Sequence, residues 1–130
     1  MKKIIFICCI SLFFISNIFS IPLSELHIVA DDGTFLGSFE NKYSKNSIYN
    51  EYGDFGSPYG NNSLMNIYSN YSSDYSDKSP FNKYANHAPW LFDNRGKNYG
   101  RLSINKYASG VTDDSYKIAY QLKALRDSLR

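Results

Sequence analysis

The side chains with most potential for chemistry lie in a stretch that repeats every 16 residues. Three successive copies begin at Ser47, Ser63 and Ser79, and within each copy an asparagine and a tyrosine keep fixed places. The aligned residues are Asn50, Asn66, Asn82, Tyr52, Tyr68 and Tyr84. Phenol rings give contact area at low entropic cost, and amides give directional hydrogen bonds, which suits sugars, peptides or another protein. These six residues, with Trp90 where the repeats end, are the candidate binding residues.

A second interpretation of the tyrosines is that they form the core of the repeats. Large aliphatic side chains are scarce between Phe39 and Trp90, where the sequence offers only Ile48, Leu64, Met65 and Ile67. Any core in this stretch is therefore expected to be built from aromatic rings. For any single tyrosine, packing is at least as good an explanation as binding.

The sequence predicts no catalytic residue, metal ligand or cofactor site. His27 and His87 lie far apart, and neither belongs to an HExxH motif or a Gly-x-Ser-x-Gly elbow. His87 occupies the repeat position of Phe55 and Tyr71, so it is expected to replace a ring. The alternative function is a small secreted hydrolase that uses His27 or His87.

Residues 1–20 have the pattern of a cleaved signal peptide. A basic leader precedes an apolar run from Ile4 to Ile15, and a more polar end closes at Ser20. The apolar run is short for a bilayer-spanning helix, which needs about 20 residues, although an uncleaved anchor is the alternative. We therefore predict a secreted or periplasmic protein with no stable membrane insertion after cleavage. Both cysteines lie in this segment, so the mature chain has no thiol.

Cleavage changes the charge balance. It removes two of the 14 basic residues and leaves 12 against 12 acidic ones, so the net charge falls from +2 to zero. A neutral chain has no field that would attract nucleic acid, and no nucleic-acid partner is predicted. The expected partner is an envelope glycan or a protein. A soluble inhibitor of a secreted enzyme is a third possibility, and the oligomeric state stays open.

Two similar hairpins flank the repeats in a single mature α+β domain, residues 21–130. The first hairpin, 26–39, turns at Asp31-Asp32-Gly33, and the second, 90–107, turns over 93–96. Each continues through a second glycine to Asn-Lys-Tyr. Such hairpins can pair into one small antiparallel sheet, with the repeats, 43–89, as the excursion between them.

Each copy of the repeat is expected to form a short turn of helix followed by a looped return. Fixed-period repeats usually stack, in which case the aligned asparagines would form a ladder between neighbouring turns. Low-complexity disorder is the competing interpretation, because serine, asparagine, glycine and aspartate are abundant. The tyrosine-rich composition argues against simple disorder.

The C-terminal residues 112–129 predict an amphipathic helix. Thr112 or Asp113 caps its start, and Ile118, Leu122, Leu125 and Leu129 form one apolar stripe. The expected position is across one face of the sheet. A helix lying on a membrane surface is the alternative.

The Asn-x-Tyr and Tyr-Gly phrases, followed by a hairpin and a C-terminal helix, resemble small secreted bacterial proteins of unknown function that carry tyrosine-, glycine-, serine- and asparagine-rich 16-residue repeats. The resemblance covers most of the mature chain, and Ser69, Ser72 and Ala85 depart from it where glycine is usual. It implies an architecture and no mechanism. The sequence therefore predicts an exported, tyrosine-rich, non-enzymatic interaction or structural protein of the cell envelope.

Overall fold

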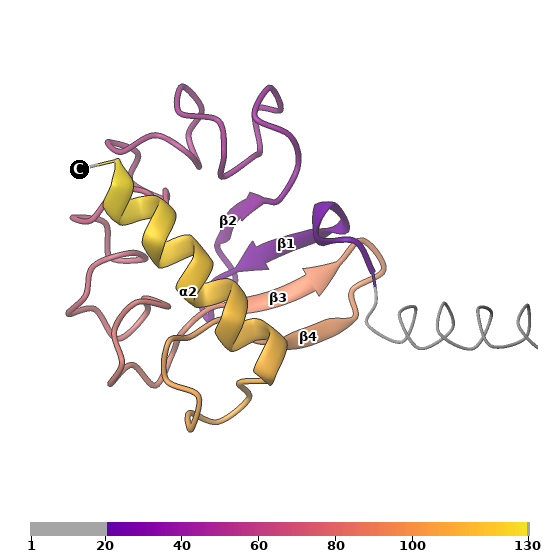
Figure 1. Ribbon diagram of the computed structural model, residues 1–130, viewed down its shortest axis with the longest axis vertical. Helices are drawn as coiled ribbons and strands as arrows, with labels where there is room; N and C mark the ends of the chain where they lie inside the picture. Colours follow the sequence, from indigo (N-terminus) through magenta and orange to yellow (C-terminus); the bar gives the residue numbers. More distant parts are fainter. Residues whose placement is uncertain (1–20, 130) are drawn as a thin grey trace, which may run out of the picture.

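A four-stranded antiparallel sheet and one long helix form the frame of the molecule (Figure 1). The computed structural model describes residues 21–129. After the short 3-10 helix η1 (Leu23–Glu25), the strands are β1 (Leu26–Val29), β2 (Phe35–Ser38), β3 (Trp90–Asp93) and β4 (Asn98–Arg101). The predicted α+β class, with two hairpins in one antiparallel sheet, is confirmed. The predicted signal peptide, residues 1–20, lies outside the described residues.

The two hairpins meet through their first strands. The strand order is β2-β1-β3-β4, and β1 pairs with β3 in a register that places Ile28 opposite Leu91. Both hairpin turns contain a glycine with positive φ, 91° at Gly33 and 86° at Gly96, a conformation that L side chains rarely adopt. The two hairpins, which are similar in sequence, are therefore also similar in structure, and they lie side by side through the β1–β3 pair.

The helix α2 (Asp113–Ser128) begins with a reciprocal cap. The Thr112 side chain accepts a hydrogen bond from the Ser115 N–H, and the Ser115 hydroxyl accepts one from the Thr112 N–H. The predicted stripe packs inward, with Leu122 buried and Ile118, Leu125 and Leu129 packed partly against the core. The start and the apolar face of the helix agree with the sequence prediction.

The repeat segment is an arc of consecutive β-turns around the C-terminal half of α2 (Figure 1). At nearly every third residue from Ser44 to Ala85, a backbone N–H donates to the carbonyl three residues earlier. Successive turns therefore start three residues apart, except that the interval is four residues after Gly53 and again after Ser69. Four intervals of three and one of four produce the 16-residue period. The expected alternation of a helical turn with a looped return is therefore wrong. Serine and asparagine side chains at the turn starts bond nearby backbone N–H groups, which favours turns over helix.

One hydrophobic core serves the sheet, the helix and the repeats. Its buried side chains include Ile28, Leu36, Leu91, Leu102 and Leu122 from the frame, and Ile48, Leu64, Met65 and Phe81 from the repeats. The expectation that aromatic rings build the core of the repeats is wrong for most tyrosines. The few aliphatic residues are sufficient because the arc of turns shares the core of the sheet and helix instead of enclosing its own.

Candidate functional site

Seven turns of one kind each carry an exposed tyrosine. Every turn begins with asparagine or serine, has tyrosine third and ends with a small residue, and its last N–H donates to its first carbonyl at 3.0–3.3 Å. They are Asn41–Ser44, Asn50–Gly53, Ser57–Gly60, Asn66–Ser69, Ser73–Ser76, Asn82–Ala85 and Asn105–Ala108. In each turn the tyrosine N–H also donates to the side-chain oxygen of the first residue, at 2.9–3.2 Å. These two hydrogen bonds fix the backbone conformation of each turn and therefore the position of its tyrosine.

We call the tyrosines of these turns the turn tyrosines. They are Tyr43, Tyr52, Tyr59, Tyr68, Tyr75, Tyr84 and Tyr107, and their exposed fractions range from 76% to 97%. The remaining five of the 12 tyrosines include Tyr49, Tyr71 and Tyr99, which pack partly against the core. Of the candidate binding tyrosines, Tyr52, Tyr68 and Tyr84 thus lie on the surface, where a partner can reach them.

The three asparagines predicted as binding residues form hydrogen bonds within the chain. Each Oδ1 atom of Asn50, Asn66 and Asn82 accepts the N–H of the turn tyrosine two residues later. Each Nδ2 donates to the carbonyl six residues earlier, at 2.9–3.1 Å. The asparagines therefore bind the chain itself and hold the turns in place. The expected ladder between stacked copies is replaced by these short-range bonds.

Buried serines join more distant points of the arc. The hydroxyls of Ser63, Ser69 and Ser72 donate to carbonyls eight residues earlier, at 3.1, 2.6 and 2.5 Å. The Ser47 hydroxyl donates to the carbonyl of Glu40, seven residues earlier, at 2.7 Å. Because these serines are buried, the bonds are shielded from water. Buried hydrogen bonds consequently stabilise the backbone that carries the turn tyrosines.

Two hollows lie between pairs of turn tyrosines. The first hollow, between Tyr43 and Tyr52, has a volume of about 380 Å³ and is also lined by Tyr49, Asn50, Lys42 and Glu51. The second hollow, between Tyr75 and Tyr84, has a volume of about 410 Å³ and is also lined by Phe81, Asn82, Asp74, Lys83, Ile104 and Lys123. Burial raises the pKa of the Tyr49 phenol, which favours its neutral form.

Three turns place a lysine against the turn tyrosine. The Nζ atoms of Lys42, Lys83 and Lys106 lie 5.4, 5.2 and 5.2 Å from the ring centroids of the tyrosines that follow them. These are cation–π distances, although each pair is exposed to water and contributes little to stability. The recurring Asn-Lys-Tyr phrase thus has a recurring surface geometry.

Trp90 does not join the turn tyrosines. Its Nε1 donates to Asp31 at 2.9 Å, and the guanidinium of Arg101 lies 4.1 Å from its ring centroid. Arg101 also pairs with Asp31 at 3.2 Å. The indole therefore links β3 to the first hairpin, and we leave it out of the proposed binding surface.

The two histidines lie in different settings. His27 lies on the sheet with its ring 5.8 Å from Phe35 and 6.3 Å from Phe92. His87 is exposed and its Nδ1 is hydrogen-bonded to Asp77, so it does not take the packed ring position expected for it. The Asn86 N–H and then His87 hold the pKa of Asp77 below its usual value. Within residues 21–129, neither imidazole is hydrogen-bonded to a hydroxyl that could act as a nucleophile.

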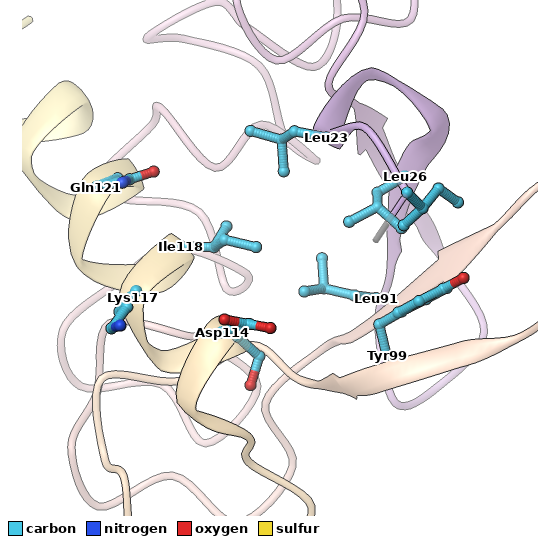
Figure 2. Close-up of a pocket in the computed structure, with 10 residues that line it drawn as sticks. Leu23, Leu26, Leu91, Tyr99, Asp114, Lys117, Ile118 and Gln121 are labelled. Carbon is cyan, nitrogen blue, oxygen red and sulfur yellow. The ribbon is translucent and has the colours of Figure 1, made fainter. Parts of the chain in front are cut away.

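An apolar groove lies between α2 and the sheet (Figure 2). Ile118 points from the helix towards Leu23 and Leu91, and Tyr99 forms one end. The groove has a volume of about 340 Å³, and Asp114 is among the polar residues at its edge. Its walls are mainly aliphatic, so it lacks the paired rings of the two hollows.

Two other kinds of site are absent from the part of the chain that the structure describes. Between residues 21 and 129, no three histidine, cysteine, aspartate or glutamate side chains gather where they could hold a metal ion. In the same part of the chain, no helix has the length and apolar character needed to cross a membrane.

Comparisons with protein families, with curated proteins and with solved structures give no significant match to this chain. The assignment of the site therefore rests on its geometry.

Sequence reasoning missed four of the turn tyrosines as candidates, namely Tyr43, Tyr59, Tyr75 and Tyr107. A signal for all seven is present in the sequence: asparagine or serine, any residue, tyrosine, then glycine, serine or alanine. The same phrase also selects Tyr71, whose turn Ser69–Ser72 has the same two hydrogen bonds but whose ring packs partly against the core. The 16-residue period conceals this shorter phrase because it contains two versions of it, one beginning with asparagine and one with serine.

Proposed function

We propose that the protein is an interaction module of the cell envelope that binds an extended partner through its turn tyrosines. The observation that carries the proposal is the exposure of seven rings from seven turns of the same construction. Soluble domains usually bury such rings, because removing apolar surface from water is favourable. Here the fold presents them to solvent.

The braced turns also favour binding on entropic grounds. Tyrosine has few rotatable bonds, and its backbone in these turns is already fixed by two hydrogen bonds. A partner that orders the ring therefore loses little conformational entropy. Several weak contacts to one extended partner add up to a higher overall affinity than any single contact provides.

Co-sedimentation with the isolated envelope of the producing cell tests this proposal. The triple substitution of Tyr52, Tyr68 and Tyr84 by serine should reduce the bound fraction strongly while leaving the unfolding temperature nearly unchanged. Substituting Asn70, which is exposed and makes no side-chain hydrogen bond among the described contacts, by serine provides the matched control. Equal binding by the triple variant and the wild type would refute the proposal, and so would a wild type that stays in the supernatant.

A further inference from the structure

The two hollows between turn tyrosines are structural equivalents. Adding 32, two repeat periods, to Tyr43, Tyr49 and Tyr52 gives Tyr75, Phe81 and Tyr84, and these residues occupy the same places in the second hollow. Both hollows thus have a phenol on either side and an aromatic ring between them. A site that recurs with the sequence period is a product of the repeat itself.

The middle copy of the repeat has the two side tyrosines but not the central aromatic ring. The equivalent residues are Tyr59, Met65 and Tyr68, so both side rings remain and a thioether replaces the central ring. Tyr59 and Tyr68 are as exposed as their counterparts, at 87% and 86%. The sequence period thus repeats a pair of exposed tyrosines three times along the chain, which suits a partner that is itself repetitive.

The available hydrogen-bonding groups narrow the chemistry of that partner. The amides of Asn50 and Asn82 line the hollows, but each already makes a bond through both its oxygen and its nitrogen to the backbone. The phenol hydroxyls of the exposed side rings can both donate and accept. Sugar hydroxyls do the same, whereas the flat C–H faces of a sugar ring match the faces of aromatic rings.

The charges at the hollows favour an uncharged partner. Lys42 and Glu51 line the first hollow, and Asp74 lies with Lys83 and Lys123 at the second. Asp74 is also held by Arg126 at 2.8 Å, which places a further positive charge beneath it. The charges balance at the first hollow, whereas lysine is in excess at the second, so a strongly charged polymer would not be attracted equally at both and a neutral chain suits the pair better.

We infer that each hollow takes one sugar ring of a neutral polysaccharide, with the ring held between the two turn tyrosines. Volumes of about 380 and 410 Å³ lie at the small end of ligand sites, which fits a single ring of a longer chain better than a compact multi-ring ligand. This inference rests on the proposed function and names the class of partner for it.

The test uses uncharged oligosaccharides of glucose and of N-acetylglucosamine, each as a single sugar and as longer chains, in calorimetric titrations of the purified protein. Longer chains should bind at least as tightly as single sugars, because each chain offers several rings that fit a hollow. The double variant Y52S/Y84S, which removes one side ring from each hollow, should lose about tenfold or more in affinity. Tyr120 lies on α2, is 46% exposed and lines neither hollow, so Y120S should bind like the wild type.

Three results would overturn the inference. One is equal loss of binding in Y120S and Y52S/Y84S, and another is tighter binding of a proline-rich peptide than of every neutral sugar chain. The third is binding to the isolated envelope that depends on Tyr52 and Tyr84 with no binding to the sugars, in which case the proposed function stands and the partner is not a neutral sugar chain. No binding to either the envelope or the sugars would refute both.

Discussion

Replacing Arg126 with methionine should destabilise the protein by breaking the link between α2 and the repeats. The Arg126 side chain is 1% exposed. Its guanidinium donates to the carbonyl of Ser72 and to Asp74, and lies 4.5 Å from the ring centroid of Phe81. The sequence places this arginine at the C-terminal, negative end of the helix dipole, but the structure buries it against the arc of turns.

The size of the effect follows from these contacts. Methionine keeps the apolar stem, so the main losses are the polar ones. A buried carbonyl left without a partner costs about 1–3 kcal/mol. A shielded cation–π contact contributes about 2 kcal/mol. Asp74 is 46% exposed and stays hydrated, so loss of its ion pair adds less than about 1 kcal/mol. Some of this loss is offset because arginine no longer has to be desolvated, and we expect a net loss of about 3 kcal/mol.

Urea unfolding followed by circular dichroism measures this loss, with Lys123→Met as the control on the same helix. Lys123 is partly exposed and pairs with Asp127 one turn away, so its removal should cost only about 0.3–0.5 kcal/mol. If Arg126→Met lost less than about 1 kcal/mol and matched the control, the buried link would not support the fold and our reasoning would be wrong.

Three further predictions follow from the turns and from the first hairpin. Asn66→Ala removes two hydrogen bonds and should cost about 1–2 kcal/mol in urea unfolding, whereas Asn70→Ala should cost less than about 0.5 kcal/mol. Tyr68→Ser should change the unfolding temperature very little, because the 86% exposed ring contributes almost nothing to the core. Hydrogen bonds from Thr34, and then others, hold the pKa of Asp32 well below its usual value of about 3.9. The stabilisation is therefore complete above pH 4 and is lost as the pH falls below it, so Asp32→Asn should flatten the dependence of stability on pH in that range.

The hairpins and the helix were predictable because local signals dominate in them. The Asp-Gly turn of the first hairpin, the β-branched centre of β1 and the capped leucine stripe of α2 each specify their own structure with little help from the rest of the chain. The similarity of the two hairpins also made their pairing into one sheet a sound expectation. The β1–β3 register, with Ile28 opposite Leu91, bears this out.

The internal construction of the repeats was not predictable from the 16-residue period alone. Serine or asparagine at turn starts, three residues apart, sets the succession of turns, and one step of four residues hides this spacing. The burial of Arg126 was also not apparent, because the partner carbonyl of Ser72 lies 54 positions away in the sequence. The tyrosines could not be assigned to core or surface until the shared core was known.

Nitration of tyrosines in the folded protein, mapped by mass spectrometry, tests the central claim most directly. Tetranitromethane reacts with accessible phenolate groups. The seven turn tyrosines should be modified readily in the native state, whereas Tyr49, which is half-buried with a raised pKa, should react only after denaturation. Uniform reactivity of all tyrosines would mean that the repeats are disordered. Protection of the turn tyrosines would mean that they form the core. Either result would contradict the claim that hydrogen-bonded turns expose these rings to a partner.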